Sequence, residues 1–244
     1  MHRCRTMVAA ACAVALAAPA ATLAAVTTQT FTTSQSEFDP GVRNQGWWSA
    51  TFANGDDNPN YFAGVVTVRP GEAHVLRNFL SFDLASACRP GAVTLQLTRF
   101  TQTQALTYLL FDVSTPAPVL NANDGTSAAI FGDLGSGTSF GGSSVAPGAP
   151  GDVLSFPLNA AGVAAFDAAR GGFFSIGGST GAFEASPEDA FIYGNSEVSG
   201  TQQLVVRCLP RTSEECKDGG WRDFGSRFRN QGQCVASVQR PPKP

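Results

Sequence analysis

Apolar and polar residues alternate along most of the chain with a repeat of two residues. In the segment RNFLSFDLA, Leu80, Phe82 and Leu84 share one side, and the residues between them are polar. The alternation recurs in further segments, with apolar sets at Val93, Leu95 and Leu97, at Leu109, Phe111 and Val113, and at Leu154, Phe156 and Leu158. Because successive side chains of a strand point to opposite faces, this pattern predicts strands with one buried face.

Turn-forming residues separate these segments. Gly, Pro, Asn, Asp and Ser cluster between them, as tight turns require. Seven or more such segments, with hardly any helical repeat, predict an all-β fold, either an antiparallel β-sandwich or a jelly roll. Residues 132–152 are so rich in Gly, Ser and Pro that a long surface loop is expected there.

One short helix is expected within LNAAGVAAFDAARGG. Asn159 is a suitable N-cap, Arg170 would lie in the last turn and Gly171 would follow the end of the helix. The apolar residues that would face the sheet are Leu158, Val163 and Phe166.

The first 25 residues have the anatomy of a secretory signal peptide. A short basic region with Arg3 and Arg5 precedes an alanine-rich apolar run at residues 7–18, and small residues follow near Ala25. Lipid modification of Cys12 is an alternative. No later segment approaches the ~18 consecutive apolar residues of a spanning helix. We therefore expect a secreted, periplasmic or cell-envelope protein without a transmembrane segment.

Composition divides the remaining chain into a domain at residues 26–209 and a tail at residues 210–244. The domain holds 15 Asp or Glu against 7 Arg, whereas basic residues predominate in the tail. An acidic body argues against nucleic acid as a partner.

Four cysteines remain after the predicted signal peptide, and an even number in an exported chain indicates disulfides. Three pairings are open. Proximity in sequence favours Cys216–Cys234, which leaves Cys88–Cys208.

The tail has helical spacing of its aromatic residues. Trp221, Phe224 and Phe228 stand at i, i+3 and i+7, which predicts one aromatic face on a small α segment closed by a disulfide. The final QRPPKP is expected to be disordered.

Catalytic residues are scarce. His74 is the sole histidine beyond the signal peptide, and no G-x-S-x-G segment accompanies it. Paired carboxylates for glycoside cleavage stay open, because their separation in space is not readable from sequence.

Oxygen ligands gather in NGDDNPNYF, and no other cofactor is expected. Calcium prefers six to eight oxygen ligands, and an ordinary turn uses the same residue types. The candidate ligands are Asn54, Asp56, Asp57, Asn58 and Asn60, with Asp124 and Asp133 as residues that could complete a site.

Two adjacent tryptophans, Trp47 and Trp48, follow RNQG. In an extended segment their side chains point to opposite faces, so one of them is expected to leave the core. An exposed aromatic ring beside polar groups is suited to a sugar ring, and Tyr61 and Trp221 are further candidates. Packing beneath a loop or the tail is the alternative.

Three stretches resemble known families. NYFAG, RNFLSFDLA and GAVTLQLTRF resemble the opening strands of secreted bacterial jelly-roll modules related to carbohydrate-binding modules, although their tryptophan-rich second half is missing. TYLLFDVSTP, IFGDLGSGTSFGG and the segment at residues 154–178 are similar to an uncharacterised family of exported bacterial proteins. The tail is similar to a recurrent C-K-x-G-G-W…N-Q-G-x-C-V motif at the C-termini of exported bacterial proteins, which implies a detachable element.

These observations predict an exported non-catalytic protein that binds glycan or cell-surface material. The first alternative is a structural or adhesive envelope protein that acts through protein contacts. A glycoside-active enzyme with paired carboxylates is the third hypothesis.

Overall fold

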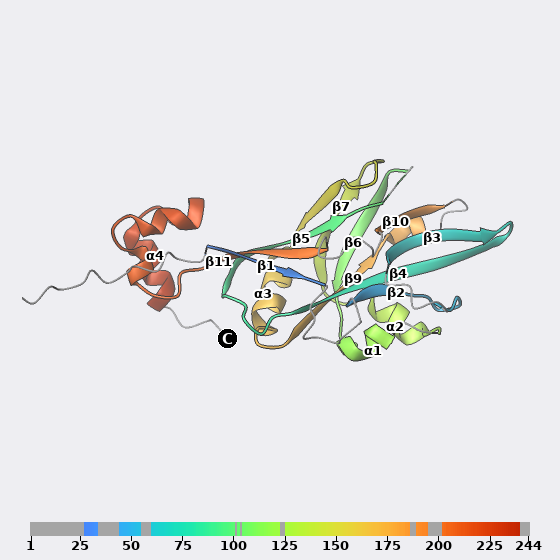
Figure 1. Ribbon diagram of the computed structural model, residues 1–244, viewed down its shortest axis with the longest axis horizontal. Coiled ribbons are helices and arrows are strands. Elements are labelled where there is room, and N and C mark those ends of the chain that lie inside the picture. The colour runs from blue at the N-terminus through green and yellow to red at the C-terminus, as the bar shows by residue number, and fades with distance from the viewer. Residues whose placement is uncertain are drawn as a thin grey trace, which may run out of the picture.

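A computed structural model describes residues 27–33, 44–54, 60–100, 102, 104–122, 125–185, 189–194 and 202–239. The predicted signal peptide and the last five residues of the predicted disordered end lie outside these ranges. The described strands form two sheets that are antiparallel throughout (Figure 1).

The smaller sheet has four strands in the order β1, β11, β5, β8. Its strands are β1 (Thr28–Thr32), β11 (Gln203–Cys208), β5 (Pro90–Thr98) and β8 (Val153–Pro157). The first strand of the domain therefore pairs with its last strand, which closes the domain.

The larger sheet has seven strands, with the order β10, β3, β4, β9, β6, β7 and with β2 paired to β4. They are β2 (Gln45–Trp48), β3 (Tyr61–Arg69), β4 (Glu72–Asp83), β6 (Leu106–Asp112), β7 (Ser139–Val145), β9 (Phe173–Ser179) and β10 (Ala190–Gly194). One edge of the long strand β4 pairs first with β3 and then with β2. The predicted all-β sandwich class is confirmed.

The core lies between the two sheets and follows the alternation of the sequence. Leu80 and Phe82 of β4 face Leu95 and Leu97 of β5, and all four are completely buried in one cluster. In β6 the expected face is wrong, because Leu106, Tyr108 and Leu110 are the buried set. The alternation there is ambiguous since both faces of β6 are apolar.

The predicted helix is confirmed as α3 (Ala160–Ala168). The Asn159 side chain accepts a hydrogen bond from the Gly162 amide at 3.0 Å, so it caps the first turn as expected. Phe166 is completely buried against both sheets, and Arg170 lies just beyond the helix, where it pairs with Asp167.

Two features of residues 117–145 differ from the sequence prediction. The short helices α1 (Ala117–Ala122) and α2 (Ala128–Asp133) cover the outer face of the larger sheet (Figure 1). The surface loop expected at 132–152 is wrong, because strand β7 lies within it. An edge strand needs few apolar residues, and in β7 Phe140 and Val145 supply the buried positions.

The tail forms a small lobe, which we call the knot, beyond the ends of β1, β5 and β11 (Figure 1). It consists of the 3₁₀ segments η2 (Glu214–Cys216) and η3 (Gly220–Arg227) and the helix α4 (Gln231–Gln239). A further 3₁₀ segment, η1 (Gly181–Ala185), follows β9 in the sandwich.

Both expected disulfides are present. Cys88–Cys208 joins residues 120 apart in the sequence at the end of the smaller sheet, and Cys216–Cys234 joins residues 18 apart within the knot. The knot buries a cluster of its own around the second disulfide, which includes Leu209.

The aromatic helix expected at residues 221–228 is wrong. Gly225 has a φ of 65° and kinks the segment, because this left-handed conformation cannot continue a helix. Phe224 and Phe228 still meet edge to face at 6.0 Å inside the knot, whereas Trp221 is half-buried beneath the Arg222 guanidinium. Within the described ranges, no helix has the length and hydrophobicity to cross a membrane.

Candidate functional site

Trp48 lies on the outer face of the larger sheet and is covered by α1. Its indole nitrogen donates a hydrogen bond to the Leu120 carbonyl oxygen at 3.1 Å. Phe79 and Leu134 complete this second cluster, in which the indole is 5% exposed.

Trp47 points to the opposite face, as expected, but is also buried, with 7% exposure. Its ring stacks on Phe52 with centroids 5.8 Å apart, and Phe52 stacks on His74 at 4.3 Å. Trp48 thus leaves the main core, as expected, but neither tryptophan is exposed, and both are covered by other segments of the chain. Phe52 covers Trp47 on one face of β2, and α1 covers Trp48 on the other face. Both segments follow β2 in the chain.

His74 closes this stack rather than standing in an open cleft. The ring nitrogen Nε2 lies 3.2 Å from Oε1 of Glu72, and the imidazole side chain is 13% exposed. No serine or cysteine nucleophile contacts it among the hydrogen bonds of the described residues. His74 is therefore a packed side chain that stacks on Phe52 and has Glu72 as its acidic neighbour.

Tyr61 also points into the sandwich. It is completely buried, and its hydroxyl donates to the Thr98 carbonyl oxygen at 2.8 Å. Burial raises the pKa of Tyr61 well above its usual value, so the hydroxyl stays protonated. A sugar ring cannot reach this aromatic face.

The neighbours of Tyr61 build a different aromatic surface, which we call the aromatic strip. It comprises Phe62 of β3, Phe191 and Tyr193 of β10, and Phe100 beyond β5. Phe62 lies 4.7 Å from Phe191 and 5.5 Å from Tyr193, and Phe100 lies 5.3 Å from Tyr193, as centroid distances. Four rings from three segments therefore form one continuous apolar surface.

The strip is accessible, unlike the tryptophan pair. Phe100 is 40% exposed, and the other three rings are half-buried. Partial burial raises the pKa of Tyr193, so its hydroxyl is a neutral donor and acceptor at neutral pH. An apolar surface with a polar handle is suited to a ligand that has both an apolar face and hydroxyl groups.

Backbone contacts hold the strip in place. The Phe100 amide donates to the Tyr193 carbonyl oxygen at 2.9 Å, and the Asp189 carboxylate accepts from the Thr67 amide at 2.7 Å. Gly64, with a φ of 127°, lies opposite Phe191 in the register, and a Cβ there would come within 2.1 Å of the Ala190 oxygen. Glycine is thus required for β10 to approach β3 closely.

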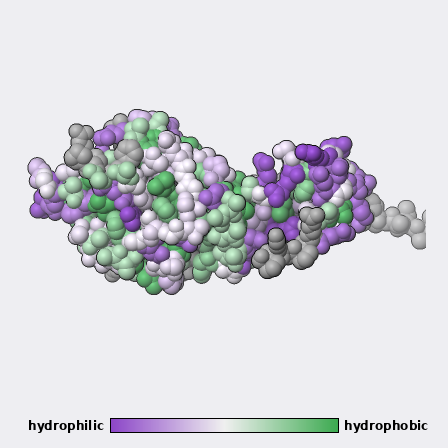
Figure 2. Space-filling model, turned by 180° about the vertical axis from the view of Figure 1, so that it is seen from behind, coloured by the Kyte–Doolittle hydropathy of each residue, from purple (hydrophilic) through white to green (hydrophobic). Residues whose placement is uncertain are grey.

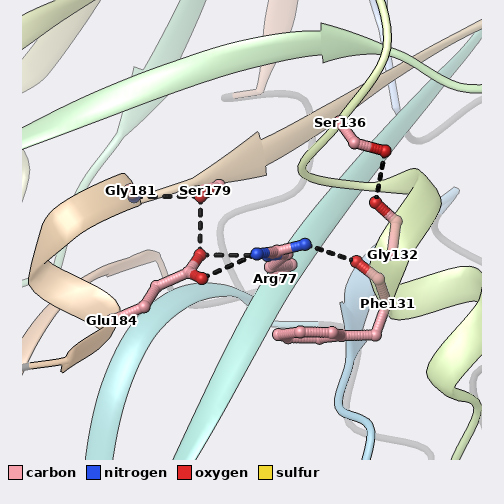
Figure 3. Close-up of polar contacts among 7 residues, drawn as sticks. All are labelled: Arg77, Phe131, Gly132, Ser136, Ser179, Gly181 and Glu184. Atoms are coloured by element: carbon pink, nitrogen blue, oxygen red, sulfur yellow. Dashed lines mark hydrogen bonds and ion pairs between the residues drawn. The ribbon is translucent and has the colours of Figure 1, made fainter.

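A charged cluster also lies between η1 and α2 (Figure 3). Arg77 donates to both carboxylate oxygens of Glu184, at 3.0 and 2.7 Å, and to the Phe131 carbonyl oxygen at 2.9 Å. The guanidinium lies 4.1 Å from the Phe131 ring, and Ser179 donates to Glu184 at 2.6 Å. Because both charges are fully engaged, this cluster joins segments of the fold and leaves no group poised for chemistry.

The predicted calcium ligands fall partly outside the described residues. This applies to Asp56, Asp57, Asn58 and also to Asp124. Asn54 is buried and forms a bridge with Gly125, and Asn60 is half-buried just before β3. The described ranges hold no group of three or more His, Cys, Asp or Glu suited to a metal. Calcium at this segment stays a prediction.

Asp133 has another role in the structure. Its carboxylate accepts hydrogen bonds from the amides and hydroxyls of Ser114 and Thr115, at 2.6 to 3.3 Å. Burial opposes ionisation, but these hydrogen bonds outweigh it and hold the pKa of Asp133 below its usual value. The residue thus fixes the segment that leads into α1.

Of the four sequence-predicted binding residues, Trp47, Trp48 and Tyr61 are buried, and Trp221 lies apart from them in the knot. The strip residues were not among the candidates. A signal for two of them exists in AFIYG, where Phe191 and Tyr193 flank the core residue Ile192 at a spacing of two.

The chain is thus a disulfide-bonded, two-sheet β-sandwich with a half-exposed aromatic surface. No protein-family model and no curated protein matches it. Among solved structures, the K1 cleaved adhesin domain of Lys-gingipain from Porphyromonas gingivalis W83 aligns with a TM-score of 0.30 and 10% identity, over 75% of this chain and 99% of that one. A similarity at that score carries no argument about function.

Proposed function

We propose that this protein is an exported, non-catalytic binding protein that holds glycan or cell-surface material on the aromatic strip. The observation that carries the proposal is the strip itself, where Phe62, Phe100, Phe191 and Tyr193 form one accessible surface. The apolar face of a sugar ring stacks on such rings, and the Tyr193 hydroxyl provides a hydrogen-bonding group beside them.

The disulfides support export. Both bonds are formed in the structure, and such bonds persist in oxidising compartments such as the periplasm or the extracellular space. The predicted signal peptide at residues 1–25 agrees with this and stays a prediction.

Three of the described acids, Asp133, Asp152 and Glu184, are held in ways that do not suit a general acid. A glycosidase needs a general acid whose pKa is raised. The hydrogen bond from Arg99 instead lowers the pKa of Asp152, and that of Asp133 is also lowered, while Glu184 is held by Arg77. These acids stabilise turns and ion pairs.

The second candidate function is adhesion through protein contacts, and the β3–β4 hairpin favours it. Residues 67–73 at its tip are all exposed, with Val68 48% exposed. The hairpin extends past the rest of the sandwich at the end opposite to the knot (Figure 1). A protruding ribbon of this kind can reach a protein partner.

A glycan array with the mature chain tests the proposal. Phe100→Ala and Tyr193→Ala should each weaken retention on the bound glycan by at least about ten-fold, equivalent to about 1.4 kcal/mol. Phe173→Ala is the matched control, because Phe173 is 48% exposed at the start of β9, away from the strip. Retention on no glycan, or equal losses in all three variants, would contradict the proposal. Binding to a protein target that depends on Val68 would favour adhesion.

A further inference from the structure

A groove lies where the sandwich joins the knot, at the other end of the molecule from the aromatic strip. Figure 2 shows a waist between the large lobe and the small hydrophilic lobe. The groove has a volume of about 970 Å³ and is lined by the start of β5, the end of β11, the end of η3 and residues Gln233, Ala236 and Ser237 of α4. A ligand the size of a sugar unit fits such a volume.

Three arginines from three segments line the groove. Arg89 donates to the Ser237 carbonyl oxygen at 2.8 Å, and Arg227 donates to the Gly91 carbonyl oxygen at 3.1 Å. The first bond runs from the sandwich to the knot and the second from the knot to the sandwich. Together they hold the knot against the smaller sheet. Arg207 is exposed, and its guanidinium lies beside the Gly225 kink.

No described carboxylate compensates the charges of these arginines. Within the described part of the chain, none of the three forms an ion pair with a carboxylate, and the hydrogen-bond acceptors of Arg89 and Arg227 are neutral carbonyl groups. The acid in the lining, Asp167, is paired with Arg170 at 2.6 Å. In addition, the Arg89 Nε atom is buried without a hydrogen-bond partner. Because this atom is buried, the exposed Arg207 and Arg227 are the arginines of the groove that an anionic group can reach.

Further positive charge lies on the far side of Arg89. A second hollow of about 430 Å³ is lined by Arg89 and Arg211, and also by Arg170, whose charge is paired with Asp167. The chain as a whole carries more acidic than basic residues, 19 against 16, so this concentration of arginine is local. Guanidinium groups bind carboxylate, sulfate and phosphate oxygens in paired hydrogen bonds.

We propose that the groove binds an acidic saccharide through its carboxylate, sulfate or phosphate group, with Arg207 and Arg227 as the accessible donors. Arg89 holds the knot through its hydrogen bond to Ser237 and adds positive charge to the groove wall. The proposal does not depend on the aromatic strip, because the two surfaces share no residue.

Affinity electrophoresis of the mature chain tests the proposal in gels that contain polygalacturonate, dextran sulfate, a phosphorylated glycan or neutral dextran. We expect retardation by at least one acidic polymer, none by dextran, and weakening as salt is added. Arg207→Gln should reduce the affinity by at least about ten-fold. Arg207→Lys should recover part of it, since lysine keeps the charge but not the fork of donors.

The control variant is Arg69→Gln at the hairpin tip, where the Arg69 side chain is 82% exposed and far from the groove. It removes the same charge and should leave retardation unchanged. Among the described residues, the hydrogen bonds between sandwich and knot come from Arg89 and Arg227 and not from Arg207, so Arg207→Gln is less prone to loosen the knot than Arg227→Gln. Retardation by none of the acidic polymers, or an equal loss from Arg69→Gln, would overturn the proposal. Competition by inorganic sulfate or phosphate without polymer retardation would show that the groove takes free ions and would also overturn it.

Discussion

The larger sheet carries two aromatic groups that differ in whether another segment covers them. Trp47 and Trp48 on β2 are buried beneath Phe52 and α1, whereas the aromatic strip on β3 and β10 stays half-exposed. A buried aromatic side chain contributes packing energy to the fold, whereas an accessible one can contact a ligand. The difference teaches that aromatic composition does not identify a binding surface until the covering segments are known.

The largest effect should come from Trp48. Trp48→Ala removes a buried ring and its hydrogen bond to Leu120, so the free energy of unfolding should fall by about 3–5 kcal/mol. Phe100→Ala should change it by less than about 1 kcal/mol, because Phe100 is 40% exposed. Urea unfolding of both variants measures this contrast. A loss below about 1 kcal/mol for Trp48→Ala would show that α1 does not hold the indole as described.

The second effect is the loss of stability in the knot alone when its disulfide is removed. Replacing Cys216 and Cys234 by alanine removes a crosslink worth about 3 kcal/mol in the chain-entropy model, within a lobe that has a small core. Amide hydrogen exchange should become fast throughout residues 214–239, while β3 and β10 keep their protection. Faster exchange in β10 as well would show that the strip depends on the knot.

The third effect concerns ionisation. The chain has three tyrosines, and burial raises the pKa of Tyr61 and Tyr108 far more than that of Tyr193. In the unfolded chain all three ionise near pH 10. Above that pH the unfolded state loses protons that the folded state keeps, so stability is complete below about pH 10 and falls as the pH rises further.

Alkaline titration followed by tyrosinate absorbance should therefore show one early, reversible step and a later one that coincides with unfolding. Tyr193→Phe should remove the early step and leave the late one. An early step that survives in Tyr193→Phe would mean that Tyr61 or Tyr108 is accessible.

The sequence is informative where one side of a strand is apolar. Leu80 and Phe82 of β4, and Leu95 and Leu97 of β5, alternate with polar residues, and all four were correctly predicted to face the core. The disulfides and the Asn159 cap were also predictable, since they depend on local chemistry and on an even number of cysteines.

The candidate site was not predictable, because the repeat of two residues identifies the buried face of a strand only where the other face is polar. Tyr61 and Phe62 are adjacent, and a shift of one residue moves a side chain to the other face of the sheet. β3 carries an aromatic residue on each face, and in β10 the buried Ile192 stands between Phe191 and Tyr193, so the period of two does not say which face is inside. The covers of Trp47 and Trp48 are a loop and two six-residue helices, whose place over β2 is set by tertiary packing.

The central claim is that the strip, and not the tryptophan pair, contacts the ligand. It is tested most directly by the dissociation constants of Tyr193→Ala and Trp47→Phe for one retained glycan, since phenylalanine keeps the stack on Phe52. We predict at least about ten-fold weaker binding for Tyr193→Ala and a change within about two-fold for Trp47→Phe. Unchanged affinity in Tyr193→Ala together with lost affinity in a folded Trp47→Phe variant would contradict the account.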